Sequence, residues 1–325
     1  MNNQVHKMII DTDPGIDDAM AIFTAMAHPH IDLIGLTTTF GNVSVDQATS
    51  NALKLVEMAG LEIPVAKGVA SPWFKPLAPF PDFVHGVDGF GNLNLSAPRS
   101  STVEVSAAQF IVEQVNSHPG EITIVAIGPL GNLATALHLD PDLPKKVKQV
   151  VIMGGVIATD GNVSPVAEAN ILSDPHAADH VFAAPWNLVM VGLDVTHQIL
   201  LPRDLFDEIA ERNPRVGQFM RDSAQFYINF YSGVRGIDGC YGHDVSAVVY
   251  VAHPEFFGTV SGPVCVATEG CAIGQTIMSR YGIPYPLKHW TDRPAQLACL
   301  VVDDQSVLRT FREAMTSDYW SKLAG

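Results

Sequence analysis

Residues 8–18 read MIIDTDPGIDD, a short apolar run followed by a turn and four closely spaced carboxylates. A continuous apolar run of this kind is typical of a strand buried on both faces. Pro14 and Gly15 supply turn chemistry, and a helical pattern extends over residues 17–27. Strand, tight turn and helix in this order form the first unit expected of a doubly wound α/β fold.

The same alternation continues along the chain. Further apolar runs, which we interpret as buried strands, cover residues 33–36, 122–127, 150–153 and 188–191. Amphipathic helical patterns lie between them, at residues 44–59, 103–117 and 174–183. This alternation predicts an α/β fold with a doubly wound, mostly parallel central sheet and helices on both faces. No composition shift marks a linker, so we expect residues 1–325 to form a single domain.

The longest irregular stretch, residues 71–99, is rich in Pro, Phe and Gly. Loops of this length inside compact domains usually cover a functional site or are disordered. The aromatic side chains of this stretch favour an ordered loop that packs against the rest of the chain: Trp73, Phe74, Phe80, Phe83 and Phe90.

Composition excludes several classes of partner. The chain has 34 Asp and Glu against 19 Lys and Arg, a formal net charge of −15. Such a surface repels phosphate backbones and anionic lipid, so we expect no nucleic-acid polymer and no membrane as partner. No apolar run reaches the roughly 18 residues of a spanning helix, and no signal-peptide pattern opens the chain. Four cysteines without CxxC spacing fit a reduced, cytoplasmic protein.

The carboxylates Asp11, Asp13, Asp17 and Asp18 lie where a doubly wound sheet binds its ligands, at the carboxyl end of a strand. Asp17 and Asp18 begin a helix, and capping of free amides would account for one or two of the four. Four anions on one turn repel, and in a partly dry cleft they take up protons or hold a cation. Oxygen ligands favour a hard divalent metal such as calcium or magnesium. We therefore expect a metal site here.

Two familiar acidic motifs fit less well. An EF-hand loop needs Glu at its twelfth position, but counting from Asp11 reaches Ile22. The Asp-x-Asp at a strand end is also similar to phosphatases of the haloacid dehalogenase type, which need a downstream lysine and a second acidic pair. Asp303 and Asp304 lie very late in the chain, and no lysine obviously follows a strand. A metal-dependent phosphatase stays open as the weaker alternative.

The segment DTDPGIDDA at residues 11–19 resembles the signature of the inosine-uridine-preferring nucleoside hydrolases. Further segments match the same family in order and spacing, over about three quarters of the chain: TFGN at 39–42, HGVDG at 85–89, GPLGN at 128–132, MGG at 153–155, GN at 161–162, AEAN at 167–170 and HD at 243–244.

The resemblance implies calcium-dependent hydrolysis of the N-glycosidic bond of a ribonucleoside, which yields ribose and a free base. It assigns Ca²⁺ to Asp13, Asp18 and Asp244, with a main-chain carbonyl at Gly131, where the family often has threonine. Asp13 would also take a proton from the attacking water as general base. His243 matches the position of the family's catalytic acid, and a histidine of near-neutral pKa suits that role.

The resemblance also implies the contacts to a small-molecule ribonucleoside. The ribose hydroxyls would be held by Asp17, Asn42, Asn162, Glu168 and Asn170, and further substrate contacts would come from His85, Met153, Tyr227, Tyr231 and Arg235. Residues 225–235 read as a helix with Tyr227, Tyr231 and Arg235 on one face. We expect those tyrosines to face the site, and Phe226 and Phe230 to point inward.

One position departs from the family. Many relatives carry Phe where this chain has Ala169, so base preference cannot be inherited from them. His243, where purine-specific members tend to have tryptophan, favours a pyrimidine-preferring or broad enzyme. A non-catalytic nucleoside- or ribose-binding protein that keeps the metal site is the main alternative. Because family members are typically dimers or tetramers, we expect a homodimer or homotetramer.

Overall fold

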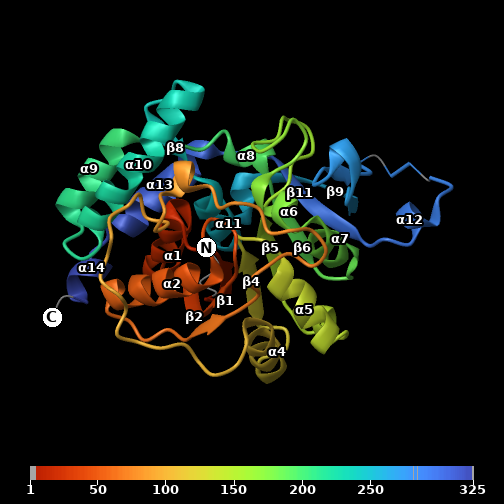
Figure 1. The fold of residues 1–325 in the computed structure, drawn as a ribbon, viewed down its shortest axis with the longest axis horizontal. Helices are drawn as coiled ribbons and strands as arrows, with labels where there is room; N and C mark the ends of the chain where they lie inside the picture. Colours follow the sequence, from red (N-terminus) through yellow and green to blue (C-terminus); the bar gives the residue numbers. More distant parts are fainter. Residues whose placement is uncertain (1–4, 281, 284, 324–325) are drawn as a thin grey trace.

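A computed structural model describes residues 5–280, 282–283 and 285–323 (Figure 1). The described residues form a nine-stranded sheet in the order β10-β9-β11-β6-β5-β4-β1-β2-β3. Its strands are β1 His6–Thr12, β2 Ile31–Thr38, β3 Val65–Lys67, β4 Ile122–Ala126, β5 Gln149–Met153, β6 Leu188–Val191, β9 Phe257–Val266, β10 Thr276–Met278 and β11 Ala295–Val302. All neighbours pair in parallel except β9, which is antiparallel to both β10 and β11. The predicted α/β fold with a mostly parallel sheet is confirmed.

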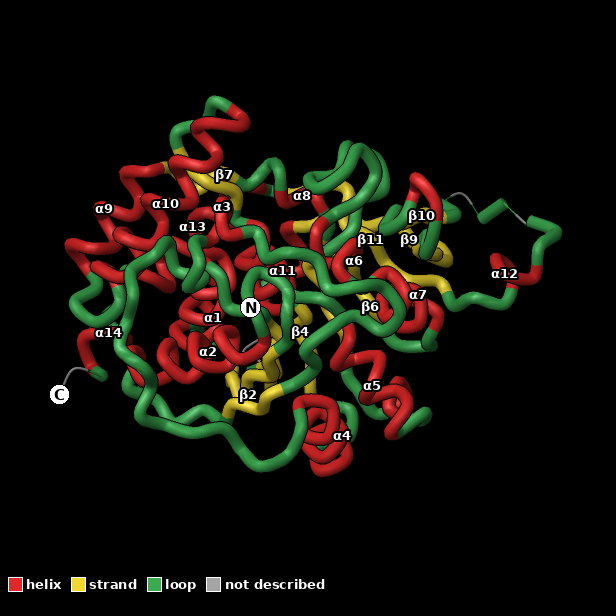
Figure 2. Tube along the Cα trace, in the orientation of Figure 1, coloured by secondary structure: helices red, strands yellow, loops and turns green. Residues whose placement is uncertain are grey.

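Helices cover both faces of the sheet (Figure 2). One face packs against α1 Ile16–Ala27, α2 Val45–Ala59, α10 Gly217–Arg235, α11 His243–Ala252 and α13 Asp304–Met315. The other packs against α4 Ala107–Ser117, α5 Gly131–Leu139 and α7 Pro175–Ala183. Successive strand residues serve opposite faces: Met8 and Ile10 belong to the first core, and Ile9 belongs to the second. This explains why the strands read as unbroken apolar runs.

The remaining elements are shorter or peripheral. They are α3 Asp82–His85, α6 Ala169–Ser173, α8 Leu193–Thr196, α9 Arg203–Arg212, α12 Lys288–Thr291, α14 Tyr319–Lys322, a two-stranded sheet of β7 Leu200–Pro202 and β8 Gly239–Tyr241, and 3-10 turns at Leu143–Lys145, Pro254–Phe256 and Gly270–Ala272. Among the described residues, none of these helices or the longer ones is both long and apolar enough to cross a membrane.

Most expected element boundaries hold within about two residues, with two exceptions. The helix expected at 225–235 already begins at Gly217. The helix expected at 103–117 begins only at Ala107, because Ser106 accepts the backbone N–H of Gln109 and caps it. Val103 lies outside the helix, because its backbone N–H donates to the carbonyl of Val65 in β3.

The stretch 71–99 is irregular apart from α3, and its aromatic side chains divide. Phe90 is buried against Phe219 of α10, whereas Phe74 and Phe83 are 75% and 67% exposed. The expectation that all of these aromatics pack is therefore wrong for those two. Order in this stretch comes instead from Asp88, whose carboxylate accepts three backbone N–H groups downstream, those of Phe90, Asn92 and Asn94.

Candidate active site

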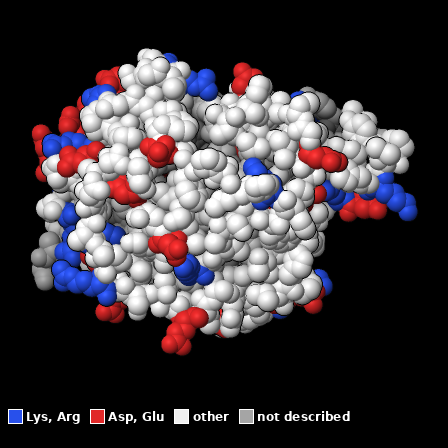
Figure 3. Space-filling model, viewed as in Figure 1, with Lys and Arg blue, Asp and Glu red and all other residues white. Residues whose placement is uncertain are grey.

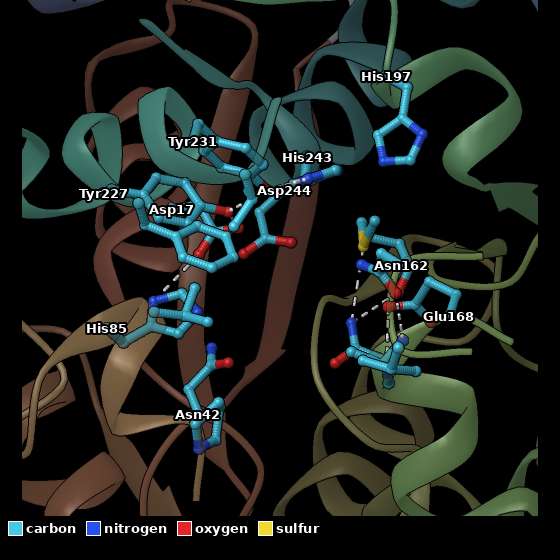
Figure 4. Close-up of a pocket in the computed structure, with 18 of the residues that line it drawn as sticks. Asp17, Asn42, His85, Asn162, Glu168, His197, Tyr227, Tyr231, His243 and Asp244 are labelled. Carbon is cyan, nitrogen blue, oxygen red and sulfur yellow. Dashed lines mark hydrogen bonds and ion pairs between the residues drawn. The ribbon is translucent and has the colours of Figure 1, made fainter. Parts of the chain in front are cut away.

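A cavity of about 440 Å³ opens at the carboxyl ends of β1, β4 and β5. Figure 4 shows its two walls facing each other across open space. All of the expected substrate contacts line it, together with the expected acid and one expected metal ligand: Asp17, Asn42, His85, Met153, Asn162, Glu168, Asn170, Tyr227, Tyr231, Arg235, His243 and Asp244. Segments up to about 230 residues apart in the sequence thus meet at one edge of the sheet, as the doubly wound topology requires.

Asp18 is held rigidly by the turn that follows β1. One carboxylate oxygen accepts the Thr12 hydroxyl at 2.5 Å. The other accepts the backbone N–H of Gly15 and the side-chain amide of Asn42, both at 2.9 Å. Asp18 therefore caps α1, as the capping interpretation allowed, while the same turn places its carboxylate among the other acids.

The neighbouring acids are less satisfied. Asp13 Oδ2 accepts the backbone N–H of Asn42 at 2.6 Å, but its Oδ1 is buried without a hydrogen-bond partner. The same is true of Oδ1 of Asp17 and of Oδ2 of Asp11. Buried polar atoms are nearly always paired, so three unpartnered carboxylate oxygens around one turn are the pattern expected of a cation site.

Asp17, Asp18 and Asp244 approach most closely: one oxygen from each lies within 4.8 Å of the others, and all three residues are buried. Burial and mutual repulsion raise the pKa of Asp244 and of Asp13 well above the usual range. Burial raises the pKa of Asp17 and of Asp18 to about 6. This donor set consists of oxygen alone and fits a hard divalent metal.

A hydrogen-bond chain crosses one wall of the cavity (Figure 4). The Tyr227 hydroxyl donates to Asp17 Oδ2 at 3.0 Å and lies 3.2 Å from the Tyr231 hydroxyl. Tyr231 in turn bonds His243 Nε2 at 2.9 Å, and His243 Nδ1 bonds the Thr196 hydroxyl at 2.8 Å. Burial lowers the pKa of His243 well below its usual range, so its imidazole is neutral. Asp17 of the acidic cluster is thus linked to a neutral histidine by hydrogen bonds through the hydroxyls of two tyrosines.

The opposite wall is built by the segment that follows β5. Glu168 caps α6, and its carboxylate accepts backbone N–H groups of Asn170 at 2.8 Å, Gly155 at 3.0 Å and Ile171 at 3.1 Å. Burial raises the pKa of Glu168 to about 7. The amide of Asn170 donates to the carbonyls of Ile127 and Met153. These bonds hold polar side chains in set positions, as recognition of a sugar requires.

Comparison with known proteins decides the family. The model of the family described as inosine-uridine preferring nucleoside hydrolase matches residues 8–309. The chain belongs to this family. It is therefore a hydrolase that acts on N-glycosyl bonds of ribonucleosides, and the resemblance seen in the sequence is confirmed.

The relatives agree along nearly the whole chain. A probable uridine nucleosidase 2 of Arabidopsis thaliana is 41% identical and covers 95% of this chain and 97% of its own length. An inosine-uridine preferring nucleoside hydrolase of Leishmania major is 37% identical over 91% of this chain and 96% of its own. A solved plant nucleoside hydrolase, 37% identical, superposes with a TM-score of 0.90 over 96% of this chain and 99% of its own. A purine-preferring enzyme of Gardnerella vaginalis, 32% identical, gives the same score over 97% and 99%.

In this nucleoside hydrolase, Gly131 lies apart from the other expected ligands. It is the first residue of α5, and its carbonyl accepts the hydroxyl of Thr135 at 2.7 Å. Gly131 lines neither the main cavity nor the adjoining one, whose walls include Asp13. A carbonyl inside a helix points along the helix axis, toward partners one turn ahead. The structure therefore does not bring Gly131 to the other expected ligands. Ile127, the residue that directly follows β4, lines the main cavity instead.

The side chains of α10 also differ from expectation. Tyr227 and Tyr231 are only 2% and 7% exposed, while Phe226 and Phe230 are partly buried. Phe230 lines the cavity and contacts Phe83 of α3, with ring centroids 6.0 Å apart. The tyrosines face the site as expected. Phe226 packs against the core but is only partly buried, whereas Phe230 lines the cavity and forms its apolar rim with Phe83.

His85 packs against the start of α1. Its Nδ1 accepts the backbone N–H of Ile16 at 3.3 Å, and its ring stacks on Tyr227 with centroids 5.3 Å apart. Burial lowers the pKa of His85 to about 4, so this ring is also neutral. His197, which directly follows α8, lines the cavity too and was not predicted, although the strand end at 188–191 marked its neighbourhood.

Proposed function

We propose that this nucleoside hydrolase requires calcium and prefers pyrimidine ribonucleosides or accepts a broad range of bases. The proposal is carried by one observation: the unpartnered buried oxygen of Asp17 and a neutral histidine chain meet in one cavity, and the unpartnered oxygen of Asp13 belongs to a residue that lines the adjoining one. A ribosyl cation developing between them would be stabilised by the anionic cluster, and the departing base by hydrogen-bond donors.

The metal would be held by Asp13, Asp18 and Asp244, with the Ile127 carbonyl as main-chain ligand in place of Gly131. The pKa increases of Asp13 and Asp244 support this, since crowded buried carboxylates either gain a cation or take up protons. When bound, calcium would offset their charge and acidify a nearby water molecule. The ion has room for further oxygen ligands, because calcium accepts six to eight.

Each group of residues in the cavity would then have its own role in the reaction. The ribose hydroxyls are held by five polar side chains: Asp17, Asn42, Asn162, Glu168 and Asn170. Asp13, with its free Oδ1, takes a proton from the water whose oxygen forms the new bond to C1′. The C1′–N bond breaks, and its electron pair leaves with the base.

His243 faces the leaving base and presents its neutral imidazole there. The tyrosine chain orients the ring, and His243 passes a proton to the base; solvent replaces that proton once the proton taken up by Asp13 has been released. The base would be surrounded by the remaining cavity side chains: Tyr227, Tyr231, Arg235, His85 and Met153.

Base preference rests on Ala169 and His243. The small Ala169 side chain leaves the wall between Glu168 and Asn170 open, and His243 provides a polar partner for a pyrimidine. Relatives carry names that include both uridine nucleosidase and purine-preferring hydrolase, so preference belongs to this chain's own cavity. The homodimer or homotetramer and the cytoplasmic location stay predictions from the sequence.

A turnover panel tests the proposal. Ribose release is measured from uridine, cytidine, inosine and adenosine with the protein as purified, after chelation, and after Ca²⁺ or Mg²⁺ is added back. We expect release from uridine at least as fast as from inosine, loss on chelation and recovery with Ca²⁺. Binding of uridine without release would support the non-catalytic alternative. Phosphate release from 4-nitrophenyl phosphate would support the phosphatase.

A further inference from the structure

His197 faces the cavity without an assigned role. It directly follows α8, beyond the carboxyl end of β6. Its ring lies 5.5 Å from that of His243 and 4.9 Å from that of Tyr241, centroid to centroid. Figure 4 shows the ring pointing into the open space above the wall that carries Asn162 and Glu168. His197 thus lies on the leaving-group side of the cavity, beside the proposed acid.

Most other polar groups in the cavity are already committed. Tyr227, Tyr231 and His243 bond to one another, and His85 accepts a backbone N–H. By contrast, no described residue forms a hydrogen bond with the ring nitrogens of His197. Because the protein leaves these nitrogens free at the cavity wall, they are available to a ligand.

The state of this ring suits a neutral partner. Burial and the neighbouring guanidinium of Arg235 lower the pKa of His197 to about 4. A neutral imidazole carries one N–H donor and one acceptor nitrogen. It therefore matches the edge of a nucleobase, where donors and acceptors alternate, better than it matches a ribose bound by carboxylates.

We propose that His197 contacts the leaving nucleobase, donating a hydrogen bond to an acceptor at the edge of the base. The proposal rests on the function proposed above. When the C1′–N bond breaks, the electron pair stays on the base and its charge spreads over ring nitrogens and exocyclic oxygens. A donor at that edge stabilises the charge as it develops. His197 transfers no proton; the chain through His243 supplies it.

The test compares two leaving groups on His197→Phe, which keeps a ring against Tyr241 and removes both nitrogens. With uridine we expect kcat/KM to fall about tenfold, the effect of one lost hydrogen bond. With 4-nitrophenyl β-D-ribofuranoside, whose leaving group lacks the edge of a base, we expect less than about a twofold change. Equal losses on both substrates, or no loss on uridine, would overturn the proposal.

Two further variants serve as a rescue and as a control. His197→Gln restores a donor and should recover part of the uridine activity. His253→Phe is a matched control, since His253 stacks on Phe256 at 4.7 Å and lies outside the cavity; it should leave both activities unchanged.

Failure of the proposed function remains distinguishable. If the wild-type protein releases no ribose, calorimetric titration with uridine and with ribose tests His197 alone. The proposal then requires weaker binding of uridine by His197→Phe with unchanged binding of ribose. Equal weakening of both, or unchanged binding of uridine, would reject it.

Discussion

Asp13 shows how closely the chain is built around one carboxylate. Gly41 and Gly128 both contact it, and a Cβ added at Gly128 would lie 2.5 Å from Asp13 Oδ1. A side chain at Gly41 would collide with the other oxygen. The two glycines of the TFGN and GPLGN segments therefore leave the room that the carboxylate needs. Motifs far apart in the chain converge on this one residue.

Asp13→Asn keeps the size of the side chain and removes its charge. We expect kcat for uridine to fall at least about 100-fold, because a general base contributes factors of that order. Steady-state kinetics measures the loss, and calorimetric binding of uridine separates it from weaker binding. A variant that keeps more than a tenth of wild-type kcat would remove Asp13 from the role of base.

Tyr231 is the middle of the hydrogen-bond chain: it connects Tyr227, which bonds Asp17, to His243. Tyr231→Phe removes only the hydroxyl, so the ring packing stays while both of its hydrogen bonds are lost. We expect kcat to fall about tenfold. Tyr241→Phe is the matched control, since Tyr241 packs on Tyr231 and no described residue bonds its hydroxyl. Equal effects of the two variants would show that the chain has no part in catalysis.

At the scale of elements, α8 organises the far wall of the site. Asp194 accepts the backbone N–H groups of Ile157 at 2.8 Å and Ala158 at 2.6 Å. Thr196, in the same helix, bonds His243. One short helix therefore anchors the start of the loop that carries Asn162 and orients the proposed acid.

Asp194→Ala frees both of those amides. We expect KM for uridine to rise several-fold, about 3- to 10-fold, with a smaller change in kcat, because Asn162 loses its support while the acidic cluster is untouched. Asp160→Ala provides the control: Asp160 is exposed on the same loop, and its side chain bonds no described residue. Equal KM values for the two variants would contradict the positioning role of Asp194.

At the scale of the whole molecule, two groups of buried titratable side chains lie at the carboxyl end and toward the amino end of β1. On the face shown in Figure 3, acidic and basic groups are scattered, so the net charge of −15 forms no single patch there. The carboxylates that matter chemically are buried at the carboxyl end of β1. A group of histidines lies toward its amino end: the rings of His30 and His253 are 5.7 and 5.5 Å from His28.

This histidine group predicts acid sensitivity. Burial, and then the nearby His253, His30 and His6, lower the pKa of His28 from 6.5 to about 4. Between these values the unfolded chain binds more protons than the folded one, so stability rises with pH and is lost as pH falls from 6.5 toward 4. After allowance for partial exposure, we expect the free energy of unfolding to fall by about 1–2 kcal/mol between pH 7 and pH 5.

Urea unfolding at several pH values, with chelator present throughout, measures this loss. His28→Gln keeps an acceptor near Nδ1, which accepts the backbone N–H of His30, and should flatten the dependence. His289→Gln, at an exposed histidine, should not. An unchanged slope in His28→Gln would assign the acid sensitivity to other groups.

The sequence by itself determined strands β1, β2, β4, β5 and β6, their alternation with helices, the mostly parallel sheet and the acidic turn, whereas β3 and β7 to β11 were not expected. The expected features follow from local periodicity and from residues adjacent in the chain, which need no knowledge of distant contacts. The substrate contacts expected from the family's segments all line one cavity, and their roles stay predictions.

Tertiary structure alone decided the rest. The bond between Asp17 and Tyr227 joins residues 210 positions apart, and only the packing of α10 against α1 creates it. Gly131 begins α5 and stays outside the cavity, whereas Ile127, directly after β4, lines it. His197 reaches the cavity by the path of α8, which its neighbours in sequence do not reveal. Periodicity shows which face of an element is buried; what that face meets depends on how the elements pack.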